Sequence, residues 1–492
     1  PNDQQKAVIA AYKSLNNDLF KMTGNDAATA KKKMEAAFSI ENQIAKVSYD
    51  QVKSRDPQAN YHPMTWDQFV KSYPGVDWNY LLKASGYPNN GGKVDVGQPE
   101  PVHEVEKILA TAPLDALKAY MELAVISSSA GMLSDNFTDR NFEYKKVAYG
   151  VQQQQPRWKR ALAFVQGIMG EAVGKLYVQK YFPESSKQRM ITLVKNLQDA
   201  FAQRIEENTW MTAATKKKAI EKLQAFDIKI GYPDKWQNMD SVFVIDDNKS
   251  LIENVKAVQE AAMKYRIAKR WGKPVDKKEW HMTPQTVNAY YDPTTNSINF
   301  PAAILQPPFF DPTVDDAANY GAIGAVIGHE MSHGFDDQGC QFDKDGNMKN
   351  WWTEEDKKNY DARTKVLVDW FNKQEVIPGL YVNGEKTLGE NIGDNGGLNI
   401  AFRALENSMK AKPLSDMDGF TPAQRFFLAW GRVWASNVAP QFVAYIVNSD
   451  VHSPSISRVN AALPMIDNWY DAFNIKEGDK LFVPQQSRAH IW

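Results

Sequence analysis

The chain has 492 residues, of which 43% are hydrophobic and 24% are charged, the ordinary balance of a globular protein. Its 58 Lys and Arg residues against 59 Asp and Glu residues give a net charge of −1, so overall charge gives no argument for nucleic acid or an anionic membrane as partner. The single cysteine, Cys340, excludes an intrachain disulfide. No run of 18 or more apolar residues occurs, and the sequence therefore predicts no membrane span.

The first half of the sequence has the periodicity of helices, because apolar residues recur at close to 3.6-residue spacing. We expect helices over 7–21, 26–53, 104–109, 114–133, 158–181, 187–223 and 251–270, with loop or connecting segments over 61–97 and 234–248. After Lys273 the pattern changes. Residues 286–300 alternate like two strands around the turn Asp292–Asn296, which predicts a hairpin.

Helices are expected again over 317–335, 353–374, 388–409 and 421–438. No internal repeat and no low-complexity tract interrupts the chain. The pattern predicts a helical half followed by a mixed α/β half, with the boundary somewhere in 235–280.

The most specific motif is an HExxH sequence that begins at His329 and ends at His333. Residues i and i+4 lie on one face of a helix, so both imidazoles can bind one Zn²⁺ ion. Glu330 can then face the metal-bound water and take its proton. The alternative is a helix with two surface histidines. With seven histidines in the chain, about 0.006 chance matches are expected, so we favour the metal site.

A third ligand is predicted in the segment Thr387–Gly397, where Glu390 and Asp394 again stand at i and i+4. Glu390 can bind the metal while Asp394 accepts a proton from a ligand imidazole, which fixes its tautomer. The glycines of this segment would let two helices approach closely. Taken alone, two acidic residues near a helix N-terminus are more often explained by the helix dipole.

Two weaker features lie on either side of these helices. His452 can donate to a developing oxyanion, and Arg458 can hold a substrate carbonyl, although both residue types are common in surface loops. Asn288 and Ala289 are expected on a strand before the metal helix, where an edge could pair with an extended peptide. An ordinary buried strand is the alternative for them.

These features occur together and in a fixed order. The segments are Val287–Tyr291, Phe300–Phe310, Val326–Asp337, Trp351–Thr353, Gly389–Leu398 and Asp450–Pro454. They resemble the neprilysin family of zinc endopeptidases, the M13 metallopeptidases, most specifically over 285–492 and only loosely upstream. The lack of disulfides resembles the bacterial endopeptidase O branch of that family.

The resemblance implies a role for each matching residue. His329, His333 and Glu390 match the ligands of one zinc ion per chain, and Glu330 matches the general base. Asp394 matches the carboxylate that orients a ligand histidine, His452 the oxyanion stabiliser, and Arg458 the residue that holds the substrate backbone after the cut. Asn288 and Ala289 match backbone-pairing positions, and the apolar pocket corresponds to Ile304, Phe309, Ala325, Val326, Val433 and Trp434. Asp336 is a further candidate for orienting His333, and Cys340 is expected to be inert.

The resemblance also implies the fold. We expect a mainly α (α+β) protein with two lobes enclosing a central cavity. Residues 1–255 would form the helical lobe over the active site, and residues 256–492 a thermolysin-like zincin catalytic lobe with a small sheet. Family members carry a segment upstream of the position of Pro1. The corresponding upstream segment of this protein is therefore an expected partner of the chain. The expected location is a bacterial periplasm, a membrane anchor upstream, or secretion, with the cytoplasm as alternative.

The predicted function is zinc-dependent hydrolysis of short peptides on the amino side of hydrophobic residues. The long interval from His333 to Glu390 and the absence of an HExxHxxGxxH run separate the chain from other zinc peptidases. Two alternatives remain: a host-protein-binding surface or adhesion protein, with peptidase activity secondary or lost, and a peptide-binding module that lost activity with its N-terminal segment. A degenerate HExxH or a missing third ligand would favour the first alternative, and neither is seen. The second alternative depends on the full inventory of the protein's segments.

Overall fold

The computed structural model describes residues 2–492 and forms two compact units. The first unit contains the described residues up to 156 together with 238–275 and 439–442. The second contains 157–237, 276–438 and 443–492. The mainly helical composition expected from the sequence is confirmed, and along residues 2–492 no helix is both long and apolar enough to cross a bilayer.

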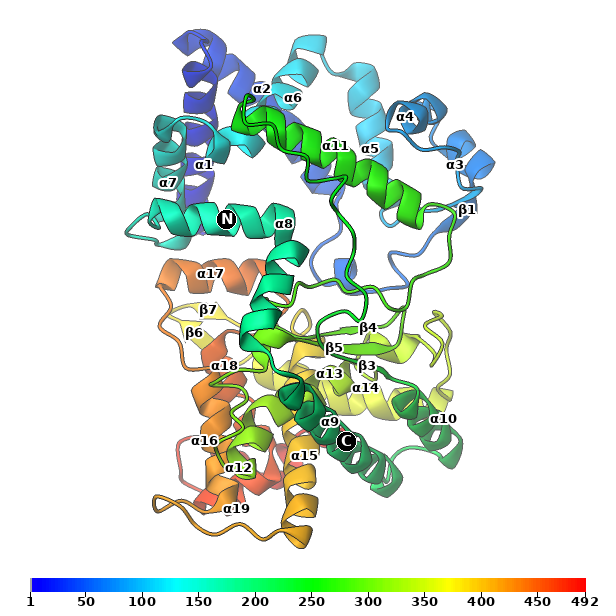
Figure 1. Ribbon diagram of the computed structural model, residues 1–492, viewed down its shortest axis with the longest axis vertical. Coiled ribbons are helices and arrows are strands. Elements are labelled where there is room, and N and C mark those ends of the chain that lie inside the picture. The colour runs from blue at the N-terminus through cyan, green and yellow to red at the C-terminus, as the bar shows by residue number, and fades with distance from the viewer. Residues whose placement is uncertain (1) are drawn as a thin grey trace. The chain divides into compact units, whose positions relative to one another are not determined.

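The first unit is a set of helices around two small cores (Figure 1). Its elements are α1 (Asp3–Met22), α2 (Ala27–Val47), η1 (Lys53–Arg55), β1 (Pro63–Thr65), α3 (Trp66–Ser72), α4 (Trp78–Ala84), β2 (Lys93–Asp95), α5 (Pro99–Thr111), α6 (Leu114–Ser129), η2 (Ala130–Met132), α7 (Asp135–Tyr149) and α11 (Leu251–Arg270). Leu19 and Phe20 of α1 pack with Leu123 of α6 in the larger core. Trp66 and Phe69 of α3 belong to the smaller one, beside the antiparallel pair β1–β2.

The second unit has one large core and most of the helices. Its helices are α8 (Arg157–Tyr181), α9 (Glu184–Glu207), α10 (Ala213–Gln224), α12 (Asp316–Asn319), α13 (Ala325–His333), α14 (Glu354–Phe371), α15 (Leu388–Ala411), α16 (Pro422–Val433), α18 (Ser455–Asn460) and α19 (Asp467–Phe473). Short turns of helix are η3 (Ala302–Ile304), η4 (Tyr320–Gly324), η5 (Gly339–Gln341), η6 (Leu463–Met465) and η7 (Gln485–Ser487), and α17 (Pro440–Ser449) crosses from the first unit into this one.

A three-stranded sheet lies beside the helices of the second unit, in the order β3–β5–β4 (Figure 1). The predicted hairpin is present, because β4 (Tyr290–Asp292) pairs antiparallel with β5 (Ser297–Pro301). The parallel neighbour of β5 is β3 (Asp227–Gly231), which the sequence pattern did not reveal. The strands β6 (Glu375–Ile377) and β7 (Leu380–Tyr381) form a separate hairpin.

Two of the predicted helical runs are not single α-helices. The run 187–223 is two helices because Thr212 caps α10, its hydroxyl accepting from the backbone N–H of Thr215. The run 317–335 is continuous but changes form, since η4 is π-helical between α12 and α13.

The compact units do not follow a single boundary between 255 and 256. Residues 157–237 of the expected helical lobe belong to the second unit, because α9 buries Leu197, Phe201 and Ile205 in its core. Residues 256–275 belong with the first unit through α11. Local periodicity identifies these helices but carries no information about which core buries their apolar faces.

Candidate metal centre

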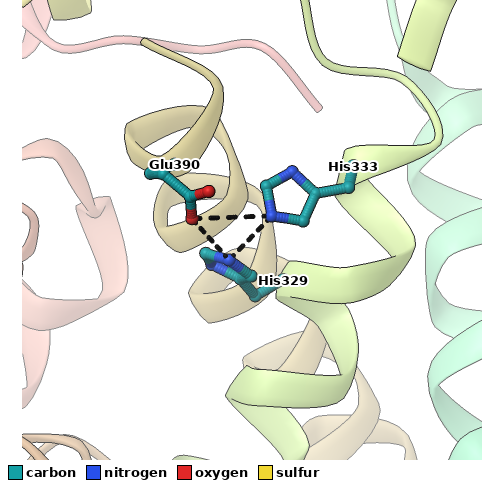
Figure 2. Close-up of side chains that lie close together, drawn as sticks. All are labelled: His329, His333 and Glu390. Atoms are coloured by element: carbon teal, nitrogen blue, oxygen red, sulfur yellow. Dashed lines mark hydrogen bonds and ion pairs between the residues drawn. The ribbon is translucent and has the colours of Figure 1, made fainter. Parts of the chain in front are cut away.

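Two neighbouring helices of the second unit bring three potential ligands together (Figure 2). His329 and His333 project from α13, and Glu390 projects from the first turn of α15. The two imidazole Nε2 atoms are 3.0 Å apart, and Glu390 Oε2 lies 3.1 Å from that of His329 and 3.6 Å from that of His333. Donor atoms around one tetrahedral zinc ion at about 2.0–2.1 Å are separated by about 3.3 Å, so the spacing suits zinc.

Glycines allow the two helices to lie this close. A Cβ on Gly393 would stand 2.7 Å from the His329 ring, and one on Gly328 would stand 2.9 Å from Gly397. Gly397 faces the backbone of α13, where an added Cβ would be 2.4 Å from the carbonyl oxygen of Ala325. The backbones therefore touch where the ligands meet, in agreement with the close approach inferred from the sequence.

Each ligand imidazole is held by a carboxylate on its far side. His329 Nδ1 lies 2.9 Å from Asp394 Oδ1, and His333 Nδ1 lies 2.7 Å from Asp336 Oδ2. A carboxylate accepts only, so each Nδ1 carries a proton, and in the neutral form of the imidazole that binds a metal each Nε2 presents a lone pair to the centre. Such partners orient ligand histidines and make them better donors.

The centre is chemically suited to a cation. Glu390 Oε2 is buried, and its nearest neighbours are the Nε2 atoms of His329 and His452, each at 3.1 Å. It faces two imidazole lone pairs, and three converging acceptors repel one another unless a positive charge lies between them. Two histidines and one glutamate form a donor set typical of catalytic zinc.

The electrostatics point the same way. Burial raises the pKa of Glu390, but the neighbouring histidines lower it by more. The net pKa of Glu390 is well below its ordinary value. Burial lowers the pKa of His333, but the nearby carboxylates of Glu390 and Asp336 raise it by more. The net pKa of His333 is well above its ordinary value. The carboxylates thus stabilise positive charge at this point.

Glu330 follows the first ligand on α13 and is 5% exposed. Burial raises its pKa, an effect that His329 and His333 partly oppose. A carboxylate with a raised pKa beside a metal site is a better proton acceptor near neutral pH than an exposed one.

His452 approaches the same glutamate oxygen from another segment. Its Nε2 lies 3.1 Å from Glu390 Oε2, and its Nδ1 lies 2.7 Å from Asp450 Oδ1. Burial lowers the pKa of His452, but Asp450 and Glu390 raise it more, to about 9. Ser453 fastens this segment to α15 by donating its hydroxyl to Asn391 Oδ1 at 2.8 Å.

Arg458 is 7% exposed and bound to Asp394, an arrangement that the sequence did not suggest. Its Nε and Nη2 donate to the two carboxylate oxygens of Asp394 at 2.8 and 2.6 Å. The guanidinium carbon lies 3.7 Å from the ring centroid of Trp434. Trp434, Arg458, Asp394 and His329 therefore form one chain of contacts that ends at a candidate metal ligand.

The apolar residues matched to the substrate pocket lie in or against one core. Ile304, Ala325 and Val326 are buried in it, and Phe309, Val433 and Trp434 pack on it partly exposed. Asn288 and Ala289 were expected on a strand, which is wrong: they precede β4. Asn288 Oδ1 accepts from the N–H of Ala289 at 3.0 Å. In the β4–β5 register Asn288 would face Pro301, which has no N–H to donate.

Sequence reasoning missed two contributors. Asp450 holds His452, and its position two residues before that histidine was a signal that could have been used. Lys222 of α10 donates three hydrogen bonds to the segment that follows α13. No local pattern marks it, because its partners are backbone carbonyls.

Comparison with known proteins identifies the family of this chain. Two models described as peptidase family M13 match residues 1–233 and 288–489. Neutral endopeptidase of Lactobacillus helveticus is 33% identical over 489 residues, which cover 99% of this chain and 73% of the relative. Human endothelin-converting enzyme 1 is 30% identical over 501 residues, covering 99% of this chain and 65% of the relative.

Solved structures extend the similarity to the whole chain. The zinc metalloprotease ZMP1 of Mycobacterium tuberculosis, in complex with an inhibitor, matches with a TM-score of 0.96 and 39% identity, over 100% of this chain and 75% of its own. PEPO from Lactobacillus rhamnosis matches with a TM-score of 0.92 and 28% identity, over 100% and 76%. The chain belongs to peptidase family M13, the neprilysin family of zinc metalloendopeptidases.

Proposed function

We propose that this chain cuts short peptides by zinc-dependent hydrolysis on the amino side of hydrophobic residues. The observation that carries the proposal is the convergence of His329, His333 and Glu390, with donor atoms within 4.8 Å of one another and Glu330 next to the first ligand. When bound there, zinc acidifies a water molecule and polarises the scissile carbonyl.

The chain's own residues supply the proton transfers. Glu330 accepts a proton from the water as its oxygen attacks the carbonyl carbon, and then delivers a proton to the leaving amine as the C–N bond breaks. His452, whose pKa is raised by its hydrogen bond to Asp450, can donate a proton to the oxyanion. Asp450 keeps that imidazole oriented.

Arg458 is proposed to bind the substrate through only one of its guanidinium nitrogens. Asp394 engages its Nε and Nη2, which leaves Nη1 to bind a backbone carbonyl of the residue after the cut. Because Val433 and Trp434 pack, partly exposed, on the core that buries Val326, we assign the pocket for that residue's side chain to this apolar surface. An apolar pocket gains free energy in proportion to the apolar area it covers, hence the preference for hydrophobic residues.

The test is hydrolysis of a quenched fluorescent ten-residue peptide with Phe or Leu after the scissile bond. Activity should disappear with a chelator and return when zinc is added. A matched peptide with Asp in place of Phe should be cut far more slowly. Equal rates for the two peptides would contradict the specificity, while activity that persists in chelator would contradict the zinc mechanism.

The Glu330→Gln variant separates binding from chemistry. The amide keeps the shape of the side chain but cannot take a proton, so turnover should fall by about 10²–10⁴-fold. Zinc content, measured by metal analysis after dialysis, should stay at the wild-type level. Wild-type turnover in this variant would exclude Glu330 as the base. The complete ligand set also argues against an adhesion protein without activity, because such a protein would not need these residues in this arrangement.

A further inference from the structure

A buried lysine lies on the far side of the turn that follows the metal helix. Lys222 of α10 is 1% exposed, and its Nζ donates to the carbonyl oxygens of Gly334, Gly339 and Phe342, each at 2.7 Å. The rings of Tyr291, Phe335 and Trp351 surround the ammonium, with centroids 5.6–5.8 Å from Nζ. A charged group in such a place is costly unless its partners are specific.

The three carbonyls show what the lysine holds. Gly334 is the C-cap residue of α13 and directly follows the ligand His333. Gly339 is the first residue of η5, and Phe342 is its C-cap residue. Lys222 therefore fastens the segment 334–342, which we name the ligand-support loop, at its start, middle and end. Three acceptors need three donated hydrogens, and the ammonium form supplies three, although burial lowers the pKa of Lys222 to about 7.

The ligand-support loop carries the carboxylate that orients His333. Asp336 Oδ2 faces His333 Nδ1 at 2.7 Å, while Asp336 Oδ1 accepts from the N–H groups of Gln338 and Gly339 at 2.9 and 2.7 Å. Gly339 thus has two connections: its N–H binds Asp336 and its carbonyl binds Lys222. The loop also lies tightly against α13, because a Cβ on Gly339 would stand 1.8 Å from the carbonyl oxygen of His333.

We propose that Lys222 is a positioning residue for the zinc site, which holds the ligand-support loop in the one conformation that keeps Asp336 on His333. This inference rests on the proposed function only in taking His333 as a zinc ligand. Without the ammonium, the three carbonyls would have to turn toward other donors, and Asp336 would leave His333. The imidazole would then lose its fixed tautomer and orientation, and with them part of its affinity for the metal.

The test measures zinc affinity by competition with a chromophoric chelator, which requires no catalysis. Lys222→Met keeps most of the apolar stem and removes the donors, and the zinc Kd should rise by about 10–100-fold. In the peptide assay kcat should fall while KM stays within about threefold, since no substrate contact is changed. Lys222→Arg, which restores a cation with several donors, should recover part of the zinc affinity. Lys217→Met, an exposed lysine on the same helix, is the matched control and should behave as wild type.

A double-mutant cycle distinguishes positioning from general destabilisation. Asp336→Asn removes the acceptor for His333 Nδ1, so it should weaken zinc binding by itself. If Lys222 acts through Asp336, Lys222→Met should weaken zinc binding much less in the Asp336→Asn background than in wild type. Should Lys222→Met not fold, the same cycle with Lys222→Arg decides. Unchanged zinc affinity in the folded variant, or fully additive losses, would overturn the proposal. A wild-type chain that binds zinc but cuts no peptide would contradict the proposed function alone.

Discussion

Asp394 has two partners, and both bear on the metal. It accepts from His329 Nδ1 through one oxygen and binds Arg458 through both. Burial raises its pKa, but the charge of Arg458 and the hydrogen bonds from His329 and Arg458 lower it more, so that the net pKa lies below the ordinary value. The carboxylate is therefore ionised at neutral pH, the form in which it can accept from both partners.

Replacing Asp394 by Asn should weaken the metal site and the fold together. The amide oxygen can still accept at the position of Oδ1, but the amide NH₂ replaces the acceptor Oδ2 and would face Arg458 Nε, which is itself a donor. Arg458 also remains buried without its counter-charge. We expect the zinc Kd to rise by about 10–100-fold and stability to fall by about 3–5 kcal/mol, measured by chelator competition and by denaturant unfolding. Asp416→Asn, at an exposed position, is the control. Wild-type zinc affinity in Asp394→Asn would refute the orienting role.

The sequence predicted some of these residues and not others for a physical reason. His329 with His333, and Glu390 with Asp394, are each four residues apart, and one helical turn places such pairs on one face. Lys222 stands 112 residues from Gly334, and its acceptors are backbone carbonyls that any residue would provide. The partnership of Arg458 with Asp394 also joins separate segments, so the sequence alone suggested a substrate role for that arginine.

The pairing of α13 with α15 depends on glycine at the contact. A Cβ at Gly397 would meet the carbonyl oxygen of Ala325 at 2.4 Å and the backbone nitrogen of His329 at 2.7 Å. Both contacts are with backbone, which cannot move as the end of a flexible side chain can. The two helices would have to separate, and Glu390 would move away from the two histidines.

Gly397→Ala should therefore lower both thermal stability and zinc affinity, despite the better helix propensity of alanine. We expect a loss of about 1–3 kcal/mol, the usual range for overpacking in a core, measured by denaturant unfolding. Gly167→Ala in α8 is the matched control, because no heavy atom lies within 4 Å of its added Cβ. That variant should gain up to about 1 kcal/mol. Equal stability changes in the two variants would contradict the argument.

Some elements that depend on local chemistry were predictable, although the short helices α3 and α4 lie within 61–97, where a loop was expected. Elements that depend on distant partners were not predictable. The hairpin of β4 and β5 was expected from alternation around a turn. β3 is only five residues long and obtains its pairing from β5, far along the chain. The position of Asn288 outside the strand likewise reflects Pro301, the residue that the β4–β5 register would place opposite it.

At the scale of the whole chain, the two units have separate cores, and every proposed zinc ligand belongs to the second. Leu123 is buried in the first unit, and Leu197 is buried in the second. His329, His333 and Glu390 all fall within residues 276–438 of the second unit. A ligand that binds only the folded state stabilises the unit that holds its site.

Removal of zinc should accordingly destabilise one unit and leave the other unchanged. Calorimetry of the full chain should resolve two transitions, and Leu123→Ala and Leu197→Ala, each costing about 2–5 kcal/mol, assign them to the first and second unit. Adding a chelator should lower only the transition that Leu197→Ala lowers. At zinc concentrations 100 times Kd the difference should be about 2.7 kcal/mol. The contrary result would be that the chelator lowers the temperature of the transition assigned by Leu123→Ala to the same extent. The two units would then unfold as one cooperative body, and their stabilities would not be separate.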